Sequence, residues 1–462
     1  MLVQPSMTTA KGVERQSGIV AMSAYALGSM ALGYLVPHFN DKWMPWLAVP
    51  LAMDQVIAFL SSLSSGMMAF TGIVFSLLLV LLQFGTTAYT PRIVGVWVRN
   101  RSLSNAAGVF VGTFLYSLMA LRGAGSLHGN ASSALTLWVA FAWLLASVFM
   151  LIRLIQIFGA LSHTNVLYDL GDAGQIAVDR LGASCTAHPG VPSGGSSKRV
   201  AADSLGAPAQ VLLHTGRPLY LRALDVARLV ALAEDGGVVI HVPYAVGDSI
   251  TGGAPLALVH GSSAVIPEEP LRDAISLGRE RLLEHDPKYA LRLLVDIAIR
   301  ALSPAICDPT TAVQALDQIE ALLKSIGNAL VDFGEACDSS GALRLVFEAT
   351  SWQEYLELGV AEIQQYGADS LQVERRLAAL CGFLRAHVPE SRRAAIDQLA
   401  EQRVATVHAA FAAVVPRACA EGSDRQGLGH TRIDRPPIDE LAPPDRRPLD
   451  VVHRGGQAAW SR

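Results

Sequence analysis

A short polar segment in the second half of the chain holds the residues best suited to bind a ligand. It is interrupted by Pro304 and Pro309, and its polar members are Asp296, Arg300, Ser303, Asp308, Thr310 and Thr311. A guanidinium can donate two parallel hydrogen bonds to an anion, so Arg300 would anchor a pocket for a small anion or a contact between subunits. The alternative is a helix–turn–helix corner, in which Arg300 pairs with Asp296 or Asp308 and the hydroxyls cap helix ends. We favour the corner and keep the pocket as the second interpretation.

A second set of candidates consists of small residues at helical spacing within apolar sequence. Steps of four, three and four place one group along a single helix face: Ser65, Ala69, Gly72 and Ser76. Another pair, Gly108 and Gly112, has GxxxG spacing. Small residues permit close helix packing in lipid, which is the interpretation we favour. The alternative is that the hydroxyl-bearing face lines a pore, because hydroxyls and backbone groups can line an ion path.

The usual motifs of catalysis and cofactor binding are missing from the sequence. It contains no HExxH, Walker A or GxSxG motif and no zinc-like spacing of cysteine and histidine. The five cysteines include no Cys-x-x-Cys pair, which predicts reduced thiols in a cytosolic compartment. A net charge of −4 argues against nucleic acid as a partner. We expect no enzymatic activity, no metal and no cofactor.

The elements that must position these residues begin with four apolar stretches, residues 18–36, 62–84, 104–121 and 135–158. About 20 apolar residues in a helix cross a hydrocarbon core of about 30 Å. We therefore predict four transmembrane helices within residues 17–160, with the Trp- and Pro-containing segment 44–53 at the membrane interface. A cleaved signal peptide is the alternative for the first stretch, although its apolar run is longer than usual. No ionisable residue lies mid-span, which disfavours an ion-coupled pump.

Basic residues are distributed unevenly over the connections between these stretches. The N-terminal segment 1–16 and the second connection carry Lys11, Arg15, Arg92, Arg99 and Arg101. The other two connections hold only Lys42 and Arg122. Short connections rich in Lys and Arg stay on the cytoplasmic side. Both termini are therefore predicted to be cytoplasmic in a multi-pass inner-membrane protein.

The remainder of the chain has ordinary charge density and is predicted to form a cytoplasmic α+β domain. Residues 161–265 would form a small α/β module similar to a barrel-sandwich, with a mobile loop at 186–210 that is rich in Gly, Pro and Ser. Residues 266–420 show helical spacing. Residues 421–462 are polar and proline-rich, and are predicted to be disordered.

Local signals mark where several helices of this region begin and end. In the module, Asp225 would cap a helix that Gly236-Gly237 terminates, before a strand at 238–242. Farther along, helices are predicted to start at Asp286-Pro287, Asp308-Pro309, the Ser351/Glu354 capping box, Asp369 and Pro389. The predicted fold class is thus membrane α-helical, with four transmembrane helices, plus an α+β domain in which a small β-rich module precedes a mostly helical part.

Three segments resemble a known family. They are SSGMMAFTGIVFSLLLVLLQFGTTAYTPR, GVFVGTFLYSLMALR and LVDIAIRALSPAICDPTTAVQALD, and the likeness covers roughly residues 15–410. The family is the bacterial predicted-membrane-protein family called domain of unknown function 2254. The resemblance implies a membrane-integral protein and no particular activity. It also draws attention to two departures: Cys307 stands where asparagine is expected, and Leu282 follows Arg281 where threonine is usual.

These observations lead to three hypotheses of function. The first is a non-enzymatic homo-oligomer in the bilayer, whose cytoplasmic domain is a scaffold and gate for a pore along the second span. The second is a sensor that binds a small ligand, such as an ion or small anion, or a partner protein through a polar site that includes Arg281 and Arg300. The third is a membrane-bound hydrolase.

Overall fold

The computed structural model of the protein describes nine segments of the chain. They are residues 7–38, 53–88, 101–126, 134–160, 163–186, 205–261, 265–329, 334–411 and 422–429. Most of the predicted interfacial segment 44–53 lies outside these residues, as do Lys42, Arg92, Arg99 and the stretch 187–204 of the predicted loop.

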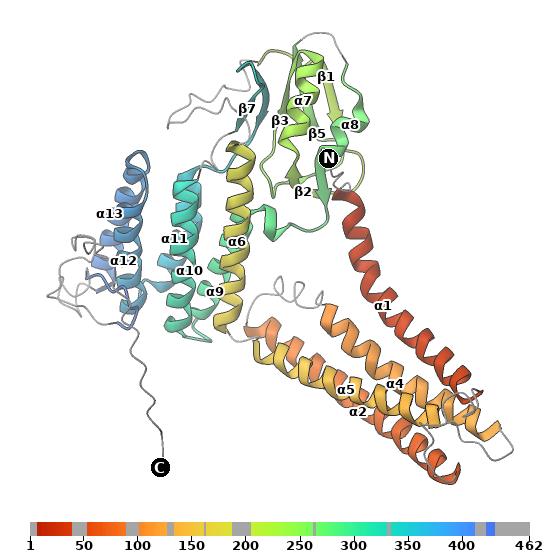
Figure 1. The fold of residues 1–462 in the computed structure, drawn as a ribbon. Coiled ribbons are helices and arrows are strands. Elements are labelled where there is room, and N and C mark those ends of the chain that lie inside the picture. The colour runs from red at the N-terminus through yellow and green to blue at the C-terminus, as the bar shows by residue number, and fades with distance from the viewer. Residues whose placement is uncertain are drawn as a thin grey trace, which may run out of the picture.

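Four long helices form an apolar bundle at one end of the molecule (Figure 1). They are α1 (Met7–Leu35), which a 3-10 turn η1 (Val36–His38) follows, α2 (Met53–Ala88), α4 (Arg101–Ser126) and α5 (Ala134–Ala160). Three of them contain stretches long and apolar enough to cross a membrane: Asp54–Val80, Leu103–Gly123 and Leu135–Gln156. The apolar part of α1, Val20–Leu35, is shorter. Length and composition thus support three of the predicted spans among the described residues, and the fourth is not confirmed.

All four helices are longer than their predicted apolar stretches, and α1 and α2 differ most, at their starts. Helix α1 begins at Met7 instead of residue 18, and α2 begins at Met53 instead of residue 62. Hydropathy marks only the part of a helix that suits lipid, whereas the helix continues as long as its residues tolerate helical geometry. Asp54 in the first turn of α2 favours this extension, because an acidic group stabilises a helix N-terminus.

Helix α4 is the centre of the bundle and contacts the other three helices. Helix α1 runs in the same direction as α4, because Tyr25 lies against Gly108 and Pro37 lies against Gly123. Helices α2 and α5 run in the opposite direction: the start of each packs near the end of α4, and the later part of each packs near its beginning. Successive helices therefore alternate in direction.

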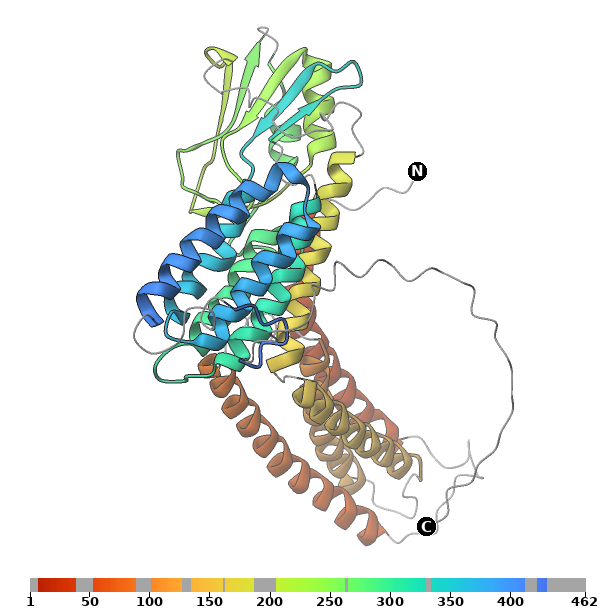
Figure 2. The ribbon, with the colours of Figure 1, turned by 90° about the vertical axis from the view of Figure 1, so that its left-hand side faces the viewer.

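A second bundle of helices lies next to the apolar bundle (Figure 2). It consists of α6 (His163–Thr186), α9 (Pro287–Ala301), α10 (Pro309–Asn328), α11 (Trp352–Gly367), α12 (Leu371–His387), a 3-10 turn η6 (Glu390–Arg392) and α13 (Arg393–Phe411). Leu167 and Leu170 of α6 belong to the same buried core as α9 and α10. The prediction that residues 161–265 form one module is therefore wrong for α6, whose apolar face packs against helices more than a hundred residues later.

The β-rich module contains two sheets with α7 (Val226–Gly236) and α8 (Glu268–Asp273). One sheet has the order β1 (Gln210–Leu213), β5 (Pro255–Gly261), β3 (Val238–Val242), β8 (Leu343–Phe347), β7 (Glu335–Cys337). The other has the order β4 (Ser249–Ile250), β2 (Leu219–Leu224), β6 (Ile275–Gly278), after which the chain enters the 3-10 turn η5 (Leu283–His285). Strand β8 pairs in parallel with β3. The module thus includes β6, β7 and β8, although residues 266–420 were expected to be helical.

Most of the predicted helix starts are confirmed by their caps. The side chains of Asp225, Asp286 and Asp308 accept backbone hydrogen bonds at the starts of α7, α9 and α10, and Ser351 forms the predicted capping box of α11. Helix α12 is capped by Ser370 instead of Asp369, and Pro389 precedes a 3-10 turn before α13.

The segment 422–429 differs from the predicted disordered tail. It forms a turn against α12, in which the backbone N–H of Asp424 donates to the carbonyl of Arg375 at 3.1 Å. The prediction took low apolar content as a sign of disorder, but this turn is held by polar contacts that composition does not reveal.

Candidate functional site

Helix α2 has two contrasting faces. Val56, Leu60, Met67 and Val74 are buried against α4. The small residues predicted as a pore or packing face all remain exposed: Ser65, Ala69, Gly72 and Ser76. At about 100° per residue they lie on the side of the helix opposite the buried residues. No neighbouring atom lies within 4 Å of the place that a Cβ at Gly72 would take, so within one chain this face has no packing partner among the described residues.

The glycine pair of α4 has a different environment. A Cβ on Gly108 would lie 2.6 Å from the ring of Tyr25 on α1, and one on Gly112 would lie 3.0 Å from the ring of Trp143 on α5. Aromatic side chains therefore occupy the space that these glycines leave open. Nearby, Thr113 and Ser147 share a hydrogen bond of 2.7 Å between α4 and α5. These glycines serve contacts within the bundle, unlike the small residues of α2.

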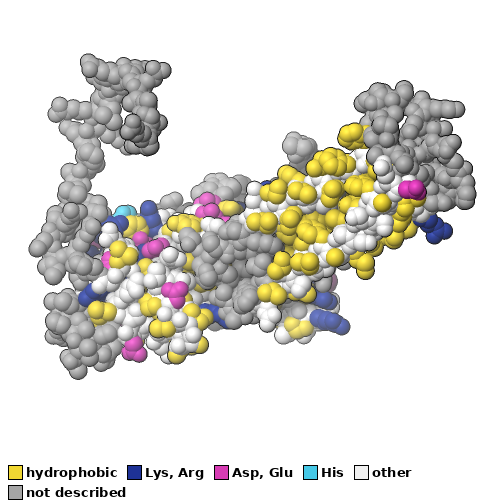
Figure 3. Space-filling view, turned by 90° about the horizontal axis from the view of Figure 1, so that it is seen from below, with side chains coloured by type: hydrophobic (Ala, Val, Ile, Leu, Met, Phe, Trp, Pro, Cys, Tyr) yellow, Lys and Arg dark blue, Asp and Glu magenta, His cyan; other side chains and the backbone are white. Residues whose placement is uncertain are grey.

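The outer face of α5 carries large apolar side chains. Leu145, Phe149, Ile152 and Ile155 are each half exposed or more, and hydrophobic side chains cover the membrane bundle in Figure 3. Large apolar residues are suited to contact with lipid, where they lose nothing by remaining outside the protein core. The outward side of α2 also has exposed apolar side chains, among them Met68, Ile73 and Leu79. Between them lies the strip of small and hydroxyl-bearing residues, which lacks this bulk.

The polar segment at the end of α9 forms a helix–turn–helix corner, with different partners from those expected. Asp296 pairs with Arg292, which also binds Glu362 of α11. Asp308 caps α10 through both carboxylate oxygens, to the backbone N–H and the hydroxyl of Thr311. Ser303 donates to the carbonyl of the preceding turn at 2.7 Å.

Arg300 makes neither of its expected ion pairs, and its buried Nε has no hydrogen-bond partner among the described residues. Cys307, next to this corner, has a positive φ of 49°. Asparagine adopts this backbone region more readily than most residues, which gives a physical reason for the asparagine that the family resemblance led us to expect here. The segment thus forms the predicted helix–turn–helix corner, and Nε of Arg300 lacks a hydrogen-bond partner among the described residues.

Arg281 is not part of this corner. It lies near the start of α9, and the 15 residues of that helix separate it from the corner by roughly 20 Å. Its guanidinium stands 5.5 Å from the ring of Tyr220 and 5.7 Å from that of Tyr289, distances at which a cation is attracted to an aromatic ring. Tyr220 is on β2 and Tyr289 is on α9, so Arg281 bridges the β-rich module and the helical bundle.

Asp286 is a buried carboxylate at the same junction. It is 2% exposed, and its Oδ1 accepts the N–H of Tyr289 at 2.9 Å. Its Oδ2 accepts no hydrogen bond from the described residues. Burial raises the pKa of Asp286 to about 6, although the nearby charges of Arg281 and Lys288 lower it. A carboxyl group with such a pKa can change its protonation state near neutral pH.

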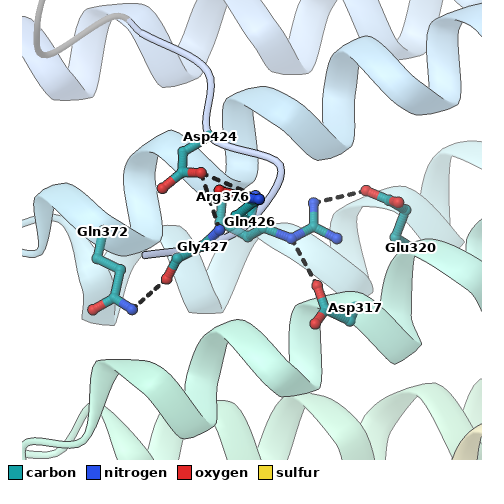
Figure 4. A network of polar contacts seen from close by, with 7 residues as sticks. All are labelled: Asp317, Glu320, Gln372, Arg376, Asp424, Gln426 and Gly427. Carbon is teal, nitrogen blue, oxygen red and sulfur yellow. Dashed lines mark hydrogen bonds and ion pairs between the residues drawn. The ribbon is translucent and has the colours of Figure 1, made fainter. Parts of the chain in front are cut away.

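A network of buried charges connects α10, α12 and segment 422–429 (Figure 4). Arg376, 3% exposed, donates to Asp317 at 2.8 Å and to Glu320 at 2.7 Å. Asp424 accepts hydrogen bonds from the backbone N–H groups of Gln426, Gly427 and Gly429. Sequence reasoning missed this network, because charged residues at helical spacing usually indicate a solvated face.

Groups that would indicate metal or hydrolytic chemistry are not found among the described residues. No cluster of three or more His, Cys, Asp or Glu side chains could hold a metal ion there. His241 and His260 lie on neighbouring strands with ring centroids 6.1 Å apart, and Nδ1 of His260 lies 3.1 Å from the carbonyl oxygen of Gly206. The described geometry therefore favours no particular reaction.

Comparison with known proteins decides the family. Residues 15–382 match the family described as predicted membrane protein, domain of unknown function 2254. The chain belongs to this family. Uncharacterised proteins of Mycobacterium bovis and of two strains of Mycobacterium tuberculosis are 28% identical to this member of the family over 433 residues, which cover 91% of this chain and 80% of each relative. No solved structure matches it significantly.

Proposed function

We propose that this member of the family is a non-enzymatic, oligomeric inner-membrane protein in which copies of α2 surround a central pore. The observation that carries the proposal is a strip of exposed small residues on the outward side of α2: Ser65, Ala69, Gly72 and Ser76. Exposed apolar side chains such as Met68, Ile73 and Leu79 flank this strip, as they would beside a contact between helices. Small residues permit close approach of helices from neighbouring subunits, and hydroxyls can line a water-filled path.

The proposed topology has four crossings with both termini in the cytoplasm. The alternating directions of α1, α2, α4 and α5 support it, because α1 runs parallel to α4 along a contact that reaches from Gly108 to Gly123. Arginines in the connection between α2 and α4 and basic residues before α1 favour that side as the cytoplasmic one. The apolar part of α1 is short, but Gly33 packs closely against Tyr116 of α4, so protein contacts replace lipid along part of it.

The domain beyond the membrane would act as a scaffold and gate. Only residues 161 and 162 separate α5 from α6, and α6 packs against both α9 and α10. A displacement of α5 would therefore move α6, and with it the side chains that α6 contributes to the core of the helical bundle. Arg180 of α6 also pairs with Glu284 at 3.1 Å, which links α6 to the chain that leaves strand β6 of the β-rich module and enters α9.

The pore is tested by a matched pair of glycine substitutions on α2. Gly72 lies on the small-residue face, whereas Gly66 lies about 90° away, and neither has a neighbouring atom within 4 Å of a Cβ position. We expect Gly72→Leu to abolish ion or dye flux through liposomes containing the purified protein and to shift its oligomeric state. Gly66→Leu would leave both unchanged.

Cysteine cross-linking in native membranes distinguishes assembly from flux. A Gly72→Cys variant is expected to form an intersubunit disulfide on mild oxidation, and Leu145→Cys on the lipid-suited face of α5 is not. No cross-link at position 72 together with a monomeric protein would remove the oligomer. A cross-linked protein without flux under voltage or membrane tension would remove the pore while leaving the assembly.

A second candidate function is recognition of a small anion at the corner between α9 and α10. The observation in its favour is the buried Nε of Arg300 without a partner among the described residues. Inorganic phosphate is the probe: it should raise the melting temperature of the wild-type protein and leave that of Arg300→Gln unchanged. An equal shift in Arg292→Gln and Arg300→Gln, or no shift in the wild type, would rule the site out.

A further inference from the structure

The junction between the β-rich module and the helical bundle contains groups that ordinary packing leaves unsatisfied. Asp286 occupies the N-cap position of α9, and this role uses only Oδ1. A buried carboxylate oxygen without a hydrogen bond is unfavourable, and it is much more unfavourable when ionised. The protonated form removes this charge and keeps the cap, because Oδ1 can still accept from the backbone.

The turn before β4 closes over this carboxylate. Gly247, with φ of 98°, lies so close that a Cβ at this position would be 2.5 Å from Oδ2 of Asp286. The same Cβ position is 3.5 Å from the guanidinium of Arg281. The backbone of the turn therefore stands beside both Asp286 and Arg281, where solvent or a closer arginine would otherwise be.

Arg281 is held beside the carboxylate without being bonded to it. The described residues offer its guanidinium the two tyrosine rings and no hydrogen bond or ion pair. The other charged groups that face Asp286 are Asp248 in the turn and Lys288 on α9. On the adjoining 3-10 turn η5, Glu284 and His285 contact Arg180 of α6. The charged side chains at the junction thus belong to four parts of the chain: the β-rich module, η5, α6 and α9.

We propose that Asp286 is a proton-operated latch between the β-rich module and the helical bundle. With a neutral carboxyl group the turn at 245–248 stays closed over it, as in the structure. When the carboxyl group ionises, Oδ2 needs a donor, and water or Arg281 can reach it only if the turn moves away. Loss of the proton therefore opens the junction and releases Arg281 from its tyrosine rings. This inference does not depend on the pore.

The direction of the pH dependence follows from linkage. The pKa of Asp286 is about 6 in the closed junction, against an ordinary value of 3.8. The closed form binds the proton more tightly than an open, solvated one, so its stability is fully present below the lower pKa and decreases as the pH rises through the higher one. Between pH 5 and pH 8 the ratio of open to closed junction should rise about tenfold.

Hydrogen–deuterium exchange of the full-length protein in nanodiscs measures this opening. The amides of the turn are suitable reporters, because that of Gly247 donates to Leu221 and that of Asp248 donates to Ala245. After correction for intrinsic exchange, we expect their protection to fall about tenfold from pH 5 to pH 8 in the wild type. Asp286→Asn keeps the Oδ1 acceptor and carries no charge, so its protection should be independent of pH.

Three further variants separate Asp286 from its surroundings. His285→Gln should retain the wild-type response, which distinguishes the carboxyl group from the histidine beside it. Asp225→Asn, at the exposed cap of α7 in the same module, should also respond as the wild type does. Gly247→Ala should expose the turn even at pH 5, because its Cβ would meet Oδ2. A pH response that survives in Asp286→Asn, or a wild-type turn equally protected at both pH values, would overturn the latch.

Discussion

At the scale of single residues, the fold depends on charged side chains where the helical pattern predicts none. Arg376 and Glu374 lie two residues apart in α12, and both are almost completely buried. The guanidinium is satisfied by two carboxylates, whereas the carboxylate of Glu374 has Arg403 at 3.7 Å and no hydrogen bond among the described residues. Of these two neighbours, Arg376 has hydrogen-bond partners for its charge and Glu374 has none in the described part of the chain. Removing the charge of Arg376 should therefore destabilise the protein, whereas removing that of Glu374 should stabilise it.

Arg376→Met should destabilise the helical bundle. It leaves Glu320 partly buried without its partner, while Asp317 is half exposed and can be solvated. We expect a loss of about 3 kcal/mol in the free energy of unfolding, the lower end of the range for a broken buried pair. Arg385→Met, which breaks an exposed pair with Asp397, should cost under about 1 kcal/mol. Denaturant unfolding of the two variants in detergent gives the comparison, and equal losses would contradict it.

Glu374→Gln should stabilise the protein at high pH only. Burial raises the pKa of Glu374 to about 7 from an ordinary value of 4.5, against the pull of Arg403. The folded state therefore binds this proton more tightly, and stability is lost as the pH rises from 4.5 through about 7. The free energies of unfolding of wild type and variant should coincide below about pH 4 and differ by pH 8.5, where that of the variant is larger by on the order of 1–2 kcal/mol. A difference that is constant across this range would show that Glu374 does not titrate there.

At the scale of elements, the sequence predicts well whatever depends on near neighbours in the chain. The caps at Asp225, Asp286, Asp308 and Ser351 are local signals, and all four are confirmed. Strand β8 is different, because it forms hydrogen bonds with β3, which lies about a hundred residues earlier in the chain. The place of α6 in the helical core depends equally on distant partners. Short strands and helix partners could not be predicted for this reason.

The small residues of the membrane helices show the same limit. Their spacing places each group on one side of a helix, but spacing cannot tell whether that side points into the bundle or away from it. The structure places Gly108 and Gly112 inside the bundle and the α2 residues outside it. Of the predicted polar site, the chain path and the caps were predictable. The pairing of Asp296 was not, because its partner Arg292 also binds the distant Glu362.

Gly108→Leu should disrupt the membrane bundle, because its side chain would displace the ring of Tyr25 and separate α1 from α4. Overpacking typically costs 1–3 kcal/mol, and a leucine at a helix–helix contact should reach at least about 2 kcal/mol. Fluorescence-detected size exclusion after heating measures the loss. Gly66→Leu, which meets no neighbouring atom among the described residues, should melt like the wild type. Equal stability of both variants would contradict the contact with Tyr25.

At the scale of the whole molecule, the proposed topology follows from the alternating directions of the four helices. If all four cross the membrane, the start of α1 and the end of α5 lie on one side, whereas three crossings without α1 would leave the side of the N-terminus undetermined. The helical bundle and the β-rich module follow α5 and must share its side.

Reporter fusions test this topology. A fluorescent protein at either terminus should be bright, and alkaline phosphatase at the same places should be inactive, because the two reporters work on opposite sides of the inner membrane. A phosphatase inserted after His128, between α4 and α5, should be active. The protein should also stay in the membrane through alkaline carbonate extraction. An active phosphatase at the C-terminus would reverse the orientation, and release by carbonate would contradict membrane integration.

The two-residue connection between α5 and α6 limits how far the large domain can depart from the lipid surface. Three consecutive Cα–Cα steps reach about 11 Å at full extension, so the base of α6 is tethered within that distance of the end of α5. A tether this short leaves almost no slack. If the bilayer becomes thinner, or if α5 tilts or its end shifts along the membrane normal, the start of α6 must move with it. The connection can absorb only a few ångströms of such a displacement.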